Sequence, residues 1–260
     1  MKLSVNGTEA FVATGGREFD ASLPSVALIH GAGFDHSAWA LHSRWFAHNG
    51  FSVLAPDLPG HGRSAGPALG SIAAMADWIS ALLDAAGSSK AYLIGHSMGS
   101  LIALEASARH PQKVSALGLI GTAATMAVGP DLLKAAEAND QAAIDMVSIW
   151  GLGFNGELGG SLVPGLWMHA GAQRVLQRNR PGVLFSDLAA CNTYKDACAA
   201  AAKVTVPTTV VLGEKDMMTP ASAGRTLAAA IPYARTVVLP GAGHMLMAQR
   251  PDELLAALKG

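Results

Sequence analysis

The sequence predicts an α/β fold in which a mainly parallel sheet carries helices on both faces. Short apolar runs suited to buried strands recur along the chain and alternate with helical patterns. Of the 260 residues, 50% are hydrophobic and 14% are charged, so the chain can bury a large core. We therefore expect a globular protein with one core and one insertion.

The predicted strands follow one another from the N-terminus. Residues 2–13 predict an antiparallel hairpin that turns at Asn6-Gly7, a dipeptide that favours a tight two-residue turn. Helical patterns lie between most of the later strands, as expected for parallel neighbours. Together with the hairpin these strands predict an eight-stranded sheet. The later strands lie near residues 25–30, 52–56, 90–95, 115–121, 206–212 and 235–239.

The alternation of strands and helices stops between Thr122 and Lys203. One helix should lead to the next strand there, but a long segment with several short helical patterns intervenes. We predict a helical insertion at this point of the chain. The expected domains are a core of residues 1–121 and 204–260 and a helical cap, or lid, of residues 122–203.

The stretch Gly95-His96-Ser97-Met98-Gly99 lies between a predicted strand and a helical pattern. A serine at the tip of a sharp strand-to-helix turn needs very small neighbours two residues before and after it, because the backbone folds tightly there. Gly95 and Gly99 occupy these positions, so we predict a nucleophile elbow with Ser97 as the nucleophile. The alternative is that the Ser97 hydroxyl only caps the following helix.

A serine nucleophile needs a base that takes its proton. His244 follows the strand predicted at residues 235–239, and Asp216 follows the strand predicted at residues 206–212. In a parallel sheet the carboxyl ends of such strands meet at one edge, where ligands bind. We therefore expect both side chains to lie near the serine, with Glu214 as the alternative acid.

In this order of nucleophile, acid and histidine the chain resembles the α/β-hydrolase family. The segment Leu28-Ile29-His30-Gly31-Ala32-Gly33 is similar to the family's oxyanion loop. The segment Ala55-Pro56-Asp57-Leu58-Pro59-Gly60-His61-Gly62-Arg63-Ser64 is similar to the turn that helps to hold that loop. The resemblance implies an α/β-hydrolase fold, an oxyanion hole formed by the backbone N–H groups of Ala32 and Met98, and a supporting role for His30.

The resemblance also implies a catalytic triad of Ser97, Asp216 and His244, because Asp216 matches the position of the family's acid. We expect His244, held by Asp216, to take the Ser97 proton as the hydroxyl attacks an ester carbonyl. An alcohol leaves, and water then releases the acid from the acyl-enzyme. The resemblance thus implies a cofactor-free serine esterase, for which we expect neither a cofactor nor a metal site.

The candidate pocket residues are mainly large and apolar, which favours a small to medium, largely apolar ester as the substrate. The alternative is that they belong to the core. Arg174, Arg178 and Arg180 either bind a substrate carboxylate, as in an enol-lactonase, or form a solvated face. The candidate pocket residues are Gly33, Phe34, Met126, Trp150, Trp167, Met217 and Met245.

Two other functions share the same predicted residues. Carbon–carbon bond hydrolases of ring-cleavage pathways use a serine triad on diketone-type substrates, and some proteins of this fold act as non-catalytic small-molecule receptors. Carbon–carbon hydrolases often carry Pro-Gly after the oxyanion segment, whereas Gly33 is followed here by Phe34-Asp35. Dehalogenases and epoxide hydrolases use an aspartate where this chain has Ser97.

Charge and hydropathy indicate which partners and which cellular location to expect. A net charge of −1 without a basic block gives no electrostatic basis for binding nucleic acid. The longest apolar stretches end well before the roughly 20 residues that a membrane span requires. The first residues lack the apolar segment of a secretory signal, so we expect a cytoplasmic protein whose partner is a small-molecule ester.

Overall fold

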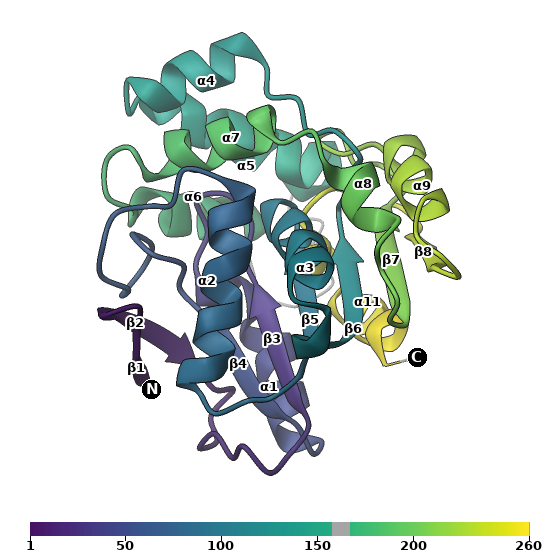
Figure 1. Cartoon of the computed structure of the whole chain (residues 1–260). Coiled ribbons are helices and arrows are strands. Elements are labelled where there is room, and N and C mark those ends of the chain that lie inside the picture. The colour runs from purple at the N-terminus through teal and green to yellow at the C-terminus, as the bar shows by residue number, and fades with distance from the viewer. Residues whose placement is uncertain (158–166, 260) are drawn as a thin grey trace.

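The computed structural model describes residues 1–157 and 167–259 and contains an eight-stranded sheet (Figure 1). The strand order is β1-β2-β4-β3-β5-β6-β7-β8. The first two strands form an antiparallel hairpin and β2 pairs antiparallel with β4, whereas the remaining neighbours pair in parallel. The predicted mainly parallel eight-stranded sheet is confirmed.

The elements lie close to the predicted ranges. The strands are β1 (Lys2–Val5), β2 (Thr8–Ala13), β3 (Ser25–Ile29), β4 (Ser52–Pro56), β5 (Ala91–His96), β6 (Val114–Ile120), β7 (Thr208–Gly213) and β8 (Arg235–Leu239). The helices of the sheet layers are η1 (His36–Trp39), α1 (Ala40–His48), α2 (Ile72–Ala85), α3 (Met98–Arg109), η2 (Pro111–Lys113), α9 (Ala221–Ala229), α10 (Leu246–Gln249) and α11 (Pro251–Leu258).

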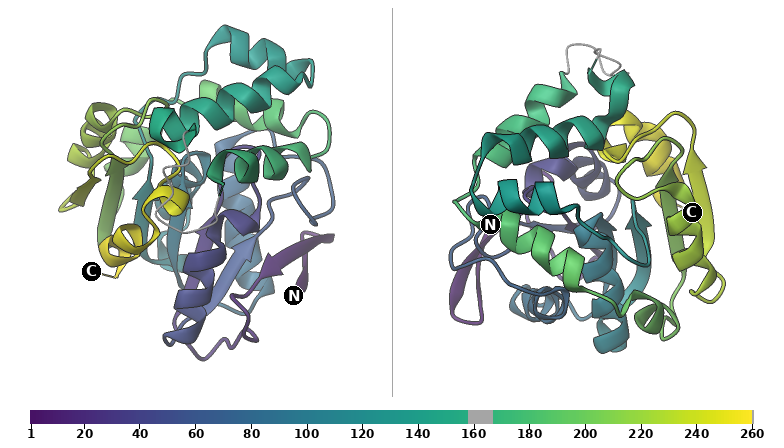
Figure 2. Two further views of the ribbon diagram at one scale, coloured as in Figure 1. Left: turned by 180° about the vertical axis from the view of Figure 1, so that it is seen from behind. Right: turned by 90° about the horizontal axis from the view of Figure 1, so that it is seen from above.

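Helices cover both faces of the sheet (Figure 2). Along β3, Ala27 and Ile29 belong to the core cluster that includes α2 and α3, whereas Val26 and Leu28 belong to the cluster that includes α1 and α11. Successive side chains of a strand point to opposite faces, so a strand covered on both sides is apolar throughout. This explains why every residue of β3 and β4 is buried.

Five described helices lie between β6 and β7. They are α4 (Pro130–Glu137), α5 (Gln141–Glu157), α6 (Met168–Gln177), α7 (Val183–Thr193) and α8 (Ala197–Ala201). Helices α4 to α7 gather above the ends of the strands (Figure 1). The proposed domain boundaries, with a cap of residues 122–203, stay a prediction.

Among the helices of residues 1–157 and 167–259, none combines the length and the apolar character that crossing a bilayer requires.

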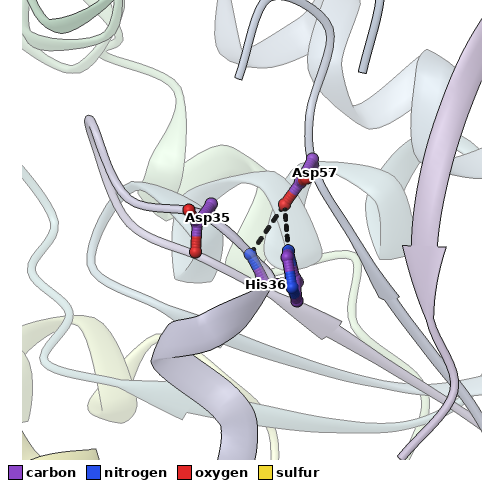
Figure 3. Close-up of side chains that lie close together, drawn as sticks. All are labelled: Asp35, His36 and Asp57. Atoms are coloured by element: carbon purple, nitrogen blue, oxygen red, sulfur yellow. Dashed lines mark hydrogen bonds and ion pairs between the residues drawn. The ribbon is translucent and has the colours of Figure 1, made fainter. Parts of the chain in front are cut away.

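A buried carboxylate organises the turn after β4 (Figure 3). Asp57 Oδ1 accepts hydrogen bonds from the backbone N–H of His36 (2.8 Å) and from its Nδ1 (2.7 Å), and Oδ2 accepts one from the Arg63 N–H (2.8 Å). Burial alone would raise the pKa of Asp57, but these hydrogen bonds outweigh it and hold the pKa below 3.8. The ionised carboxylate thus ties this turn to η1.

We expect Asp57→Asn to lower the free energy of unfolding at pH 7 by about 2 kcal/mol, because an amide nitrogen would face a backbone donor. The folded pKa lies below the unfolded value, so the carboxylate stabilises the fold above about pH 4 and loses this effect as the pH falls through the folded pKa. Denaturant titrations at pH 7 and about pH 3 should show the deficit shrinking at the lower pH.

The control is Asp77→Asn, which breaks an exposed pair with Arg109 and should cost about 0.5 kcal/mol. A deficit of Asp57→Asn that stays the same at both pH values would contradict this account of the turn.

Candidate active site

Ser97 joins β5 to α3 with backbone angles φ 54° and ψ −120°. A positive φ is strained in a residue other than glycine, and such strain occurs mainly at functional sites. A Cβ on Gly95 would lie 2.0 Å from the carbonyl oxygen of Gly99, and a Cβ on Gly99 would lie 2.3 Å from that of Ile29. The two glycines are therefore required by the backbone contacts of the turn.

The side chain of Ser97 does not serve as a helix cap. Ser97 occupies the N-cap position of the described helix α3, but its side chain makes no capping hydrogen bond there. Ser97 instead lines a cavity together with His244. The geometry thus disfavours the capping alternative.

His244 and Asp216 form a buried hydrogen-bonded pair. His244 Nδ1 lies 2.8 Å from Asp216 Oδ2, while Oδ1 accepts from the backbone N–H groups of Met218 (2.9 Å) and Thr219 (2.8 Å). Burial alone would raise the pKa of Asp216, but its interactions with His244 and Thr219 lower it. The ionised carboxylate therefore accepts a hydrogen bond from the Nδ1–H of the ring and leaves Nε2 outside this pair.

The structure distinguishes the two acids that the sequence offers. Glu214 accepts a hydrogen bond from the backbone N–H of Gly241 (2.9 Å) on the surface, and Asp216 is the one that contacts His244. Thr219 is a site residue that the sequence analysis missed. Its hydroxyl lies 2.8 Å from Asp216 Oδ2 and 3.2 Å from His244 Nδ1. An aspartate that accepts from the N–H groups two and three residues further on is a common turn, so the spacing from Asp216 to Thr219 was the available signal.

The backbone of His244 is held from two sides. His96 Nε2 donates to the carbonyl oxygen of His244 over 2.8 Å. The backbone N–H of His244 donates to the carbonyl of Gly151 in α5 over 2.9 Å. Burial lowers the pKa of His96 to about 3, so this ring is a neutral donor near neutral pH. His96 therefore orients the histidine loop and takes no charge.

The loop after β3 lies beside Ser97, since a Cβ on Gly31 would lie 3.3 Å from Ser97 Cβ. The Gly31 carbonyl accepts from His30 Nδ1 (2.9 Å) and from the Phe34 N–H (3.1 Å). The carbonyl and the N–H of one planar peptide point in opposite directions, so these bonds turn the Ala32 N–H away from them. His30 therefore supports the loop, as the resemblance implies.

The tautomer of His30 follows from its neighbours. Its Nε2 accepts the backbone N–H of Leu58 over 3.1 Å, which leaves the proton on Nδ1. Burial lowers the pKa of His30 to about 4. Within residues 1–157 and 167–259, no protein group accepts the N–H of Ala32 or of Met98. Two such donors beside Ser97 are what an oxyanion hole requires.

The cavity at Ser97 has a volume of about 70 Å³ and a largely apolar lining. Three of the predicted pocket residues line it, namely Phe34, Met126 and Met245. Residues that were not predicted also contribute, and most come from the segment between β6 and β7. They include Val128, Val147, Leu188 and Cys191.

Four of the predicted pocket residues do not line this cavity. Three are 37 to 65% exposed, and the fourth, Gly33, lies against Leu176 and Leu184 of the helices above. In the loop after Asp216, Met218 lines the cavity while its preceding neighbour faces solvent. Short loops and helix ends have no periodicity that indicates which residue points inward. The four residues are Gly33, Trp150, Trp167 and Met217.

The candidate arginines bond protein groups. Arg178 pairs with Asp35 (2.7 Å), Arg180 donates to the carbonyl of Ser64 (3.2 Å), and Arg174 donates to a neighbouring glutamine (3.1 Å). Among the described residues that line the cavity there is no Arg or Lys. The lining therefore favours an uncharged group over a substrate carboxylate.

Asp35, His36 and Asp57 bring potential metal ligands within 4.8 Å of one another (Figure 3). Asp57 and His36 already bond each other, and Asp35 accepts from the Ser37 N–H (2.8 Å) and from Arg178. A metal would have to replace these contacts. We therefore assign this cluster to the turn and not to a metal centre.

Comparison with known proteins identifies relatives over almost the whole chain. A family model described as alpha/beta hydrolase fold matches residues 24–251. The pimeloyl-[acyl-carrier protein] methyl ester esterase of Chromobacterium violaceum is 33% identical over 251 residues, which cover 90% of this chain and 92% of that protein. The putative carbamate hydrolase RutD of Klebsiella pneumoniae is 30% identical and covers 85% of this chain and 84% of its own.

The solved structures agree. The enol-lactonase from Burkholderia xenovorans LB400 superposes with a TM-score of 0.88 at 26% identity, and the match covers 100% of this chain and 98% of that chain. An esterase from Exiguobacterium antarcticum, at 18% identity, shares the fold with a TM-score of 0.86 over 100% of this chain and 97% of its own.

We expect Gly99→Ala to lower the free energy of unfolding by about 3 kcal/mol, because its Cβ would meet the backbone of β3. Thermal and denaturant unfolding measure the change. Gly171→Ala in α6 is the matched control, since its Cβ would meet nothing within 4 Å and alanine favours the helix. Equal stability of the Gly99→Ala variant and the wild type would contradict the packing described for this turn.

Proposed function

This chain belongs to the α/β-hydrolase family, and on this basis we propose that it is a serine hydrolase that cleaves a carboxylic ester of a small to medium, largely apolar substrate. The observation that carries the proposal is the apolar cavity lined by both Ser97 and His244, with His244 bonded to Asp216. Relatives named as a methyl ester esterase and an enol-lactonase support ester chemistry.

The first half of the proposed reaction forms an acyl-enzyme. Asp216 holds His244 through Nδ1, and Nε2 takes the hydroxyl proton of Ser97 as its Oγ attacks the ester carbonyl. The carbonyl oxygen becomes an oxyanion that the N–H groups of Ala32 and Met98 stabilise. His244 then passes the proton to the leaving alcohol, and the acyl group stays on the serine.

The second half releases the acid. Water gives a proton to His244 and attacks the acyl carbonyl, and the same oxyanion donors stabilise the charge. The proton returns to the serine as the bond to the acid breaks. Every proton in this sequence is carried by the histidine or by water, so the proposal requires no cofactor.

The two cavities of this region define the proposed substrate size. A second, apolar cavity of about 360 Å³ shares Phe34 and Met245 with the cavity at Ser97. Its other lining residues come mainly from η1, α1, α6 and α10. We propose that Phe34 and Met245 separate the two spaces and thereby limit the length of the apolar chain that the site accepts.

Hydrolysis of p-nitrophenyl acetate, butyrate and octanoate tests the proposed function. We expect turnover by the wild type and a loss of kcat of at least about 10³-fold in Ser97→Ala and Asp216→Asn, because the nucleophile and the orientation of its base are lost. Glu214→Gln is the matched control and should keep its activity. A folded wild type that hydrolyses none of these esters would contradict the proposal and favour carbon–carbon cleavage or ligand reception.

Chain-length preference tests the proposed separation of the cavities. We expect Met245→Ala to raise the ratio of kcat/KM for octanoate over butyrate by about fivefold or more, because the space behind Met245 becomes accessible to the chain. Met217→Ala is the matched control, since that methionine is 65% exposed. An unchanged ratio in a folded Met245→Ala variant would show that Met245 does not limit the chain.

A further inference from the structure

Asp187 is a buried carboxylate for which the proposed mechanism has no role. It lies in α7, and its side chain is 0% exposed. Its Oδ2 accepts a hydrogen bond from the backbone N–H of Gly33 (2.8 Å) and another from Nε2 of His61 (2.7 Å). One oxygen atom therefore joins α7, the loop after β3 and the turn after β4.

The ring of His61 carries a proton on each nitrogen. Its Nδ1 lies 3.0 Å from the carbonyl oxygen of Pro59, which can only accept, and its Nε2 faces the Asp187 carboxylate. Burial alone would lower the pKa of His61, but the charge of Asp187 and these hydrogen bonds raise it. The two side chains form a buried ion pair, and removal of one partner would leave the other charge uncompensated.

The ion pair acts on the peptide next to a proposed oxyanion donor. Two planar peptides flank the Cα of Ala32. The carbonyl of the first peptide, that of Gly31, is held by His30, and the N–H of the second, that of Gly33, is held by Asp187. With both peptides held, the direction of the Ala32 N–H is fixed from two sides.

Gly33 is closely confined at this position. It has a φ of 70°, and a Cβ there would lie 2.8 Å from Leu176 and from Leu184. The side-chain amide of Asn179 donates to its carbonyl oxygen. The helices above the sheet therefore supply both the packing around Gly33 and the acceptor for its N–H.

We propose that Asp187 is a positioning residue of the oxyanion hole, whose carboxylate, held by the ring of His61, keeps the peptide after Ala32 oriented so that the Ala32 N–H points at the developing oxyanion. The inference rests on the proposed function, because it assigns a task within that reaction. The position of α7 relative to the loop after β3 then contributes to the geometry of the oxyanion hole. The hydrogen bond from the Gly33 N–H to Asp187 can be tested without any measurement of activity.

Steady-state kinetics of Asp187→Asn provide the first test. The amide has almost the same shape but no charge to balance His61, so we expect kcat to fall by about 10- to 100-fold while KM changes less than about twofold. Arg178→Gln is the matched control, because it removes another contact that ties this region to the loop after β3, the pair between the exposed Arg178 side chain and Asp35. That variant should keep the wild-type kcat.

A second variant covers the case in which Asp187→Asn does not fold. His61→Gln keeps the carboxylate and removes its charged partner, and it should also lower kcat with little change of KM. In the double variant the two losses should be far from additive, because both residues act through one contact. An unchanged kcat in either folded variant, or an equal loss in Arg178→Gln, would overturn the proposal.

Hydrogen exchange of the Gly33 amide, followed by NMR, separates this inference from the proposed function. We expect this amide to be protected in the wild type and to exchange at least about tenfold faster in folded Asp187→Asn. Unchanged exchange would overturn the positioning role whatever the activity. Faster exchange in a protein that hydrolyses no ester would support the contact and contradict the proposed function instead.

Discussion

The left-handed backbone at Ser97 sets where the rest of the candidate site has to lie. It is possible because Gly95 contacts the backbone of Gly99, and because Gly99 in turn contacts the carbonyl oxygens of Ile29 and His30. The first turn of α3 therefore touches the end of β3, and the loop after β3 begins beside the serine. The Ser97 N–H donates to Ile120 at the end of β6, which anchors the same turn on its other side.

Three buried histidines near the candidate site show how the surroundings of an imidazole ring determine its charge. His30 and His96 are buried without a bonded carboxylate, so their pKa values fall to about 4 and about 3 and the rings act as neutral donors. His61 is as deeply buried, but a carboxylate faces it and its pKa is raised. The rings of His30 and His61 lie 4.9 Å apart, so a neutral and a charged imidazole coexist beside one loop.

The sequence predicted the parts of this molecule that depend on local patterns. Strand positions follow from apolar runs, and the placing of Ser97, Asp216 and His244 at one sheet edge follows from where those runs end. No such pattern indicates that Met218 lines the cavity while Met217 faces solvent. Asp187 and His61 lie 126 residues apart, and neither residue carries a local signal for the other. Such contacts arise from tertiary packing alone.

The position of Asp187 has a consequence for how segments could be exchanged among relatives. A chimera that replaced the helices between β6 and β7 would keep His61 in its turn but would lose the acid that balances it. A buried imidazolium without a counter-ion is strongly destabilising, so the incoming segment would have to bring a carboxylate to the same point or the histidine would have to change with it. The two residues therefore have to be exchanged together, although they lie in different parts of the chain.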